Sequence, residues 1–192
     1  MSLLGTARVS ALGEQQVCPC DIILFMELNR LAPDFELPDL AGRLHRLGAY
    51  RGRIVIVNFW SAECPHVVRA DALMLASLAR WGGDVALLSI ASNANESAAE
   101  VESAARGRGL SPVLMDARHE LADRCGAMVT PEVFVVDREG ILRYHGAVDD
   151  VNFRQREATR NFLNEAVDAL LAGRLPEVGE VPAFGCAIVR ET

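Results

Sequence analysis

The sequence contains no lysine, no long hydrophobic run and no paired-cysteine metal motif. All 19 basic residues among its 192 are arginine, which excludes catalysis through a lysine amine. No stretch approaches the roughly 18 apolar residues of a membrane span. The N-terminus, MSLLGTARVSALGEQQ, lacks the basic start and the apolar block of a signal peptide. We therefore expect a cytoplasmic protein without a membrane span.

Charge and cysteine content narrow the function classes further. The net charge is −7, which argues against a nucleic-acid partner because phosphate contacts need clustered cations. An odd number of cysteines in a chain with a full core does not indicate a disulfide scaffold. Cys18 and Cys20 are one residue apart and no second pair follows, so no metal or cofactor is expected. The five cysteines are Cys18, Cys20, Cys64, Cys125 and Cys186.

Strand and helix patterns alternate along the chain. Near-continuous apolar runs at residues 53–60, 85–91 and 113–116 predict buried strands. A close pair at 133–136 and 141–144 predicts an antiparallel hairpin. Helical patterns cover 65–81, 96–107, 119–125 and 156–172. Together they predict an α/β domain with a central mixed sheet flanked by helices. We assign residues 31–174 to it, 1–30 to an N-terminal extension and 175–192 to a C-terminal tail that packs on it.

Cys64 is the candidate nucleophile. It lies where a buried strand ends and a helix begins, and Pro65 suits the first helical turn. The unpaired N–H groups of that turn are expected to face the sulfur and favour the thiolate. Such positions lower a cysteine pKa from about 8.5 to roughly 3.5–7.5. His66 and Arg69 could add positive potential. The alternative is a buried, inert cysteine.

Several short motifs resemble those of thioredoxin-like proteins. Residues 59–67, FWSAECPHV, resemble their active-site stretch, in which Phe-Trp precedes C-x-x-C. Residues 129–133, VTPEV, resemble the loop whose cis-proline packs beside the reactive sulfur. Residues 31–35 and the turn at 137–140 are similar to the redoxin branch, which includes AhpC/TSA and TlpA-like proteins. Together with the G-C-A-I element at 185–188, they most resemble the peroxiredoxin-like group 1 proteins.

The resemblance spans about residues 31–190 and implies a thioredoxin-like fold with thiol–disulfide or antioxidant chemistry. It implies Cys64 as nucleophile, with Thr130 and Pro131 in the cis-proline loop and Trp60 beside the site. Ser61 takes the hydroxyl position that peroxiredoxins place three residues before their cysteine. The implied partners are thiols and disulfides of proteins or small molecules, and peroxides.

The departures from these families bear on mechanism. Val67 stands where thioredoxins have their second cysteine, and Asn58 stands where they have a buried acid. The peroxiredoxin set is also incomplete, because Val57 replaces its proline and Pro131 aligns with its arginine. We therefore expect thiol–disulfide exchange rather than efficient peroxide reduction.

Three readings stay open. In the first, Cys186 on the apolar tail resolves Cys64; Cys18, Cys20 or an external thiol could do so instead. In the second, the chain is a non-catalytic binding or redox-sensing module. In the third, it is a weak thiol peroxidase. A pKa near the free value and no turnover would favour the second reading.

The other histidines, the acidic cluster and Cys125 are mostly expected to have structural or solvent-exposed positions. His66 could tune or protonate the leaving thiol. His45, His119 and His145 are expected at the surface. The acidic cluster Glu96, Glu100 and Glu102 is expected to be a solvated helix face, with Asn95 as the helix cap. Cys125 is expected in the core.

Overall fold

The computed structural model describes residues 26–191, so the predictions for Cys18 and Cys20 lie outside the described residues. Its helices are η1 (Leu47–Tyr50), α1 (Pro65–Trp81), η2 (Gly82–Asp84), α2 (Ala98–Arg108), α3 (Glu120–Cys125) and α4 (Phe162–Leu171). Its strands are β1 (Glu36–Pro38), β2 (Leu44–Arg46), β3 (Ile54–Trp60), β4 (Val85–Ala91), β5 (Val113–Met115), β6 (Val129–Thr130), β7 (Glu132–Val136), β8 (Leu142–Gly146), β9 (Glu180–Val181) and β10 (Cys186–Ala187). None of these helices is long and apolar enough to cross a membrane.

The main sheet has six strands in the order β5-β4-β3-β7-β8-β9. β3, β4 and β5 run parallel, β7 is antiparallel to β3, and β8 is antiparallel to β7. The predicted mixed sheet and hairpin are therefore confirmed. Every residue of β3 and β4 is buried, as the uninterrupted apolar runs indicate for strands covered on both faces.

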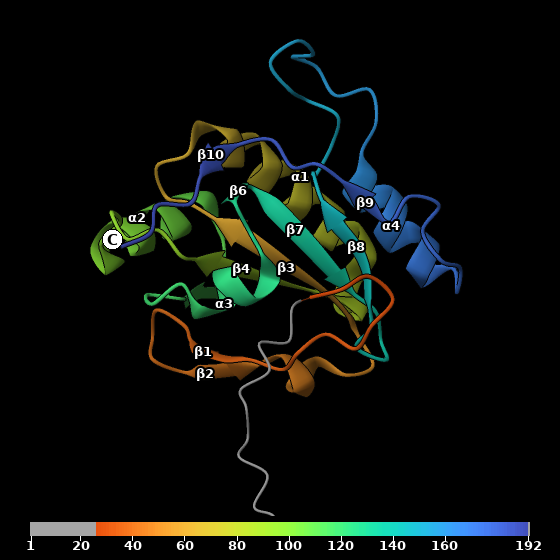
Figure 1. Ribbon diagram of the computed structural model, residues 1–192, viewed down its shortest axis with the longest axis horizontal. Helices are drawn as coiled ribbons and strands as arrows, with labels where there is room; N and C mark the ends of the chain where they lie inside the picture. The colour runs from red at the N-terminus through yellow and green to blue at the C-terminus, as the bar shows by residue number, and fades with distance from the viewer. Residues whose placement is uncertain (1–25, 192) are drawn as a thin grey trace, which may run out of the picture.

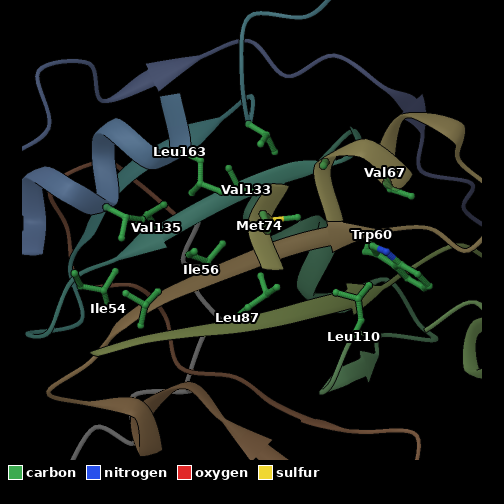
Figure 2. Packing of buried hydrophobic residues seen from close by; sticks show 14 of the residues in the cluster. Ile54, Ile56, Trp60, Val67, Met74, Leu87, Leu110, Val133, Val135 and Leu163 are labelled. Atoms are coloured by element: carbon green, nitrogen blue, oxygen red, sulfur yellow. The ribbon is translucent and has the colours of Figure 1, made fainter. Parts of the chain in front are cut away.

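Helices and loops cover both faces of this sheet (Figure 1). Alternate residues of β3 point to opposite sides, so Ile54, Ile56 and Trp60 belong to one apolar cluster and Val55, Val57 and Phe59 to another. The first cluster packs against α1, α2 and α4, and Figure 2 shows Met74 and Leu163 above the strands. The second packs against α3 and the segment that includes Phe35 and Leu47.

Two predicted helix boundaries are wrong. The last helix begins at Phe162 rather than near 156, because Asn161 caps it and Asp150 holds the preceding loop. The Asp150 carboxylate accepts the backbone N–H groups of Thr159 and Arg160 at 2.9 and 3.1 Å. α2 begins after Ser97, which forms a reciprocal capping box with Glu100. Asn95 and Glu96 therefore precede the helix.

Both ends of the described chain contact the domain. Met26 is buried in the core, and its N–H donates to the Arg124 carbonyl at 3.2 Å. After α4, β9 joins the sheet beside β8. The chain then crosses to the other end of the molecule, where β10 pairs with β6 (Figure 1).

Candidate active site

Cys64 lies at the junction of β3 and α1. The strand ends at Trp60, and four residues later Cys64 occupies the N-cap position of α1 with an extended backbone. Pro65 begins the helix, where its missing N–H costs no hydrogen bond. The Cys64 side chain is only 3% exposed. The sequence thus predicts this junction to the residue, but not the degree to which the sulfur is covered.

The contacts of the Cys64 sulfur differ from the expected ones. The side chain makes no capping hydrogen bond with α1. Instead, Sγ lies 3.2 Å from the Thr130 carbonyl oxygen, a distance that suits an S–H donor, and 2.8 Å from Cys186 Sγ. The contacts that hold the sulfur therefore come from the β6 loop and the tail, and not from the expected N–H groups of the first helical turn.

The cis-proline loop lies directly against the sulfur. The Thr130–Pro131 peptide bond is cis, and both residues are buried. Glu132 holds the loop from behind, since its carboxylate accepts the N–H groups of Met128 and Val129 at 2.8 and 3.2 Å. The loop thus presents the Thr130 carbonyl to Cys64 from a fixed backbone.

The C-terminal tail forms a strap over this loop, which we define as residues 184–191. Cys186 pairs with Thr130 in the antiparallel β10–β6 ladder. Ile188 is buried among core residues, and its N–H donates to the Met128 carbonyl at 2.9 Å. A Cβ on Gly185 would collide with the Thr130 carbonyl oxygen, so only glycine allows this close backbone approach. The strap holds Cys186 against Cys64 although 122 positions separate them.

The environment of Cys186 stabilises its protonated form. Burial and the adjacent Cys64 sulfur raise the pKa of the Cys186 thiol to about 11. Desolvation disfavours the charged thiolate, and a neighbouring anionic sulfur does so as well. Cys186 is consequently a thiol at neutral pH.

Glu96 organises the loop between Trp60 and Cys64, contrary to the expectation of a solvated helix face. Its carboxylate accepts hydrogen bonds from the Ser61 hydroxyl and from the N–H groups of Ala62 and Glu63, the last two at 2.9 and 3.4 Å. Ser61 Oγ in turn accepts the Cys64 N–H at 3.0 Å. Glu96 is buried, so these charge-assisted bonds fix the backbone that carries the cysteine. The S-x-x-E capping-box pattern of Ser97–Glu100 is the signal that could have placed Glu96 outside α2.

Arg108 fastens the same loop from the end of α2. Its guanidinium donates to the carbonyls of Ser61 and Ala62 at 3.2 and 2.6 Å. The guanidinium also lies 3.3 Å from the Asp71 carboxylate, and its Cζ atom is 5.2 Å from the centroid of the Trp60 ring. Trp60 Nε1 donates to Asp71 at 3.0 Å. Trp60 therefore packs beside the site as expected, whereas nothing in the sequence pattern indicated Arg108 or Asp71.

His66 and Arg69 do not contact the sulfurs. The His66 ring packs edge-on against Phe184 of the strap, with centroids 5.0 Å apart. Arg69 forms a bidentate ion pair with the buried carboxylate of Asp149. The structure thus brings Ser61, Thr130, Pro131 and Cys186 around Cys64 and leaves these two residues aside.

The histidines expected at the surface are largely covered. His119 is buried, and its Nδ1 lies 2.5 Å from the Ser92 carbonyl. His145 stacks on Phe134 and bonds Glu132 at 2.6 Å, and His45 bonds Asp39 and Tyr50. Each has a structural polar partner, which the sequence alone could not show.

Two further findings concern the core. Cys125 is buried as expected, and desolvation raises its thiol pKa far above the usual range, which disfavours its thiolate. Asn58 is fully buried, and neither atom of its amide has a hydrogen-bond partner in the described part of the chain. Asn58 therefore supplies no acid where thioredoxins have one.

A cavity of about 220 Å³ opens onto the sulfurs and is lined by Ser61, Glu63, Cys64, Asn93, Asn95, Glu96, Cys186, Ala187 and Val189. A larger cavity of about 460 Å³ lies at α4, and no cysteine is among the described residues that line it. Within residues 26–191, no group of three or more His, Cys, Asp or Glu side chains could hold a metal ion.

Comparisons with known proteins find similar chains. The chain is 36% identical over 115 residues to the thiol-disulfide oxidoreductase ResA of Geobacillus thermodenitrificans, covering 58% of this chain and 64% of that relative. It spans less than two thirds of that protein.

Two solved structures are also similar. A hypothetical protein from Sinorhizobium meliloti is 33% identical, with a TM-score of 0.77, over 86% of this chain and 96% of that one. The thioredoxin domain of a thiol-disulfide oxidoreductase from Bacteroides vulgatus is 16% identical, with a TM-score of 0.56, over 68% and 92%; it shows the fold alone, which is thioredoxin-like. Residues 28–145 match the AhpC/TSA family, and the chain belongs to that family.

Proposed function

We propose that this redoxin is a thiol–disulfide oxidoreductase in which Cys64 is the nucleophile and Cys186 the resolving thiol. The observation that carries the proposal is the 2.8 Å separation of the two sulfurs, brought together from positions 122 residues apart. Family membership and the similarity to a protein named thiol-disulfide oxidoreductase support it.

The exchange has two steps. The Cys64 thiolate attacks one sulfur of a disulfide RS–SR, so that a Cys64–SR bond forms, the RS–SR bond breaks and RS⁻ leaves and takes up a proton. Cys186 then loses its proton and attacks the Cys64 sulfur, which forms the Cys64–Cys186 disulfide and releases the second RS⁻. The protein dithiol loses two electrons and the substrate gains them. An external dithiol returns the protein to its starting state by the reverse exchange.

The environments of the two thiols support this order. Cys64 stands at the N-cap of a long helix, a position at which nucleophilic cysteines are found. Cys186 has a pKa raised to about 11, so it remains protonated until Cys64 has been capped by substrate. A thiol that is protonated at neutral pH suits the resolving role.

The contacts of Ser61 and the arginines weigh against efficient peroxide reduction. The Ser61 hydroxyl donates to Glu96, so it is not free to donate to a bound peroxide. Arg69 is paired with Asp149, and Arg108 with Asp71 and the loop carbonyls. A thiol peroxidase needs donors aimed at the departing oxygen, and these groups are occupied elsewhere.

Oxidation followed by cysteine mapping tests the proposal. The reduced protein receives one equivalent of hydroxyethyl disulfide, remaining thiols are alkylated, and peptides are identified by mass spectrometry. We expect a Cys64–Cys186 bridge in the wild type and a stable mixed disulfide on Cys64 in Cys186→Ser. Cys125→Ala is the matched control, because Cys125 is buried away from the site and its removal should leave the bridge unchanged.

The other outcomes are equally specific. A lone mixed disulfide on wild-type Cys64 would assign resolution to an external thiol, and a bridge to Cys18 or Cys20 would assign it to the N-terminal segment. An unmodified Cys64 would leave the chain as a non-catalytic binding or sensing module.

A further inference from the structure

The cavity beside the two sulfurs is acidic and small. Glu63 and Glu96 line it, and Asn93 and Asn95 add amide groups. Among the described residues, no arginine or histidine takes part in its lining. At about 220 Å³ it is smaller than the roughly 300–1,000 Å³ of a drug-sized site. Its volume suits the arm of a small disulfide.

The carboxylates at the cavity are not neutralised by cations. Glu96 is satisfied by hydroxyl, amide and backbone donors, all of them uncharged. Within residues 26–191, the Glu63 carboxylate bonds only to the Asn95 amide, at 3.3 Å. The nearby arginines are each paired with another acid, Arg108 with Asp71 and Arg69 with Asp149. Among the described residues, no arginine or histidine therefore forms an ion pair with Glu63 or Glu96.

We infer that this cavity makes the thiol pair selective for charge: it admits disulfides with a short neutral or cationic arm and disfavours those with a carboxylate beside the sulfur. The inference rests on the proposed function. At a separation of about 6 Å in a water-like dielectric, one pair of unit charges changes a rate by about threefold. An ammonium arm gains from both glutamates, and a carboxylate arm loses to both.

Three disulfides with arms of nearly equal length test the inference: cystamine, hydroxyethyl disulfide and dithiodiglycolate, which carry cationic, neutral and anionic arms. Each is mixed with the reduced full-length protein at low ionic strength, and formation of the Cys64–Cys186 bridge is timed by alkylation and mass spectrometry. Each rate is divided by the rate of the same disulfide with dithiothreitol, which removes intrinsic reactivity. We expect cystamine to exceed dithiodiglycolate by at least about tenfold, and added salt to reduce the ratio because it screens exposed charges.

Charge-neutralising variants locate the effect. Glu63→Gln should lower the cystamine-to-dithiodiglycolate ratio by about threefold or more. Glu139→Gln is the matched control, because Glu139 is exposed in the β7–β8 turn, at the opposite end of β3 from Cys64, and the ratio should not change.

The outcomes distinguish a failure of the charge selectivity from a failure of the exchange reaction. Equal normalised rates for all three disulfides, or a ratio that Glu63→Gln leaves unchanged, overturn this inference while the exchange reaction stands. Failure of all three to form the bridge overturns the proposed function itself.

Discussion

Replacing Arg108 by methionine should destabilise the protein because it leaves the Asp71 carboxylate buried without a counter-charge. Asp71 is 2% exposed and would retain only the Trp60 Nε1 bond. Breaking a buried ion pair from one side costs about 3–5 kcal/mol, and the partial exposure of Arg108, at 19%, favours the lower end. At roughly 2–4 °C per kcal/mol for a domain of this size, Tm should fall by about 6–12 °C.

Two companion variants make the test specific. Asp71→Asn in the Arg108→Met background removes the orphaned charge but keeps an acceptor for Trp60, so it should recover part of the lost stability. Arg106→Met is the matched control, because Arg106 is 78% exposed and only pairs with Glu102 on the surface. Such pairs contribute about 0–1 kcal/mol, so its Tm should remain close to that of the wild type.

The pH dependence gives an independent measure. Burial raises the pKa of Asp71, and the Trp60 hydrogen bond and Arg108 partly offset that rise. Loss of Arg108 raises the pKa further. A carboxyl whose folded pKa is raised destabilises the fold when ionised, so acidification restores stability. The Tm difference between Arg108→Met and the wild type, followed by circular dichroism, should therefore narrow as the pH falls from neutral. A Tm equal to that of the wild type, or no recovery in the double variant, would refute the reasoning.

Three further predictions concern the strap and the core. Resolution of a mixed disulfide on Cys64 should speed up as the pH rises and should not level off near the ordinary thiol pKa of about 8.5, because burial, the largest cause of the raised Cys186 pKa, persists after Cys64 is capped; stopped alkylation measures the rate, and a plateau by pH 9 would contradict it. Gly185→Ala should displace the strap, because its Cβ would collide with the Thr130 carbonyl oxygen. Iodoacetamide labelling of Cys64 should then be about tenfold faster, which corresponds to a loss of about 1.4 kcal/mol in the free energy of strap docking. Unchanged labelling would argue against the contact. Asn58→Leu removes a buried amide without partners and should raise the free energy of unfolding by about 1 kcal/mol, as urea denaturation would show; a decrease would mean that the amide is satisfied.

Local patterns in the sequence predict most of the fold. The apolar run at 53–60 has no alternation, and the structure buries it on both faces as β3. The helix at 65–81 matches α1, because Pro65 marks its start and apolar spacing continues to Trp81. The error at 156–161 arose where polar loop residues resemble a polar helix surface. Their hydrogen bonds to Asp150 are a loop interaction that periodicity does not reveal.

The same distinction applies to the active site: contiguous motifs can be recognised in the sequence, whereas contacts between distant segments cannot. Cys64 and the Thr130–Pro131 loop are identifiable because each is a short contiguous motif. Glu96 and Arg108 reach the loop at Ser61 from positions 35 and 47 residues away along the chain, and only tertiary packing brings them there. The sequence suggests Cys186 as a resolving thiol for Cys64. Its position, however, depends on the pairing of the C-terminal strap with β6, which lies more than 50 residues earlier in the chain.

In the proposed exchange, the strap would also set how strongly the two thiols reduce a substrate. Ile188 in the core, together with the bond between Arg190 and Asp123, holds Cys186 in place before any reaction. In the proposed disulfide, this docking sets the effective concentration of one thiol at the other. Each tenfold increase in that concentration lowers the reduction potential by about 30 mV. A residue that never touches sulfur, such as Ile188, would therefore tune the electron affinity of the pair.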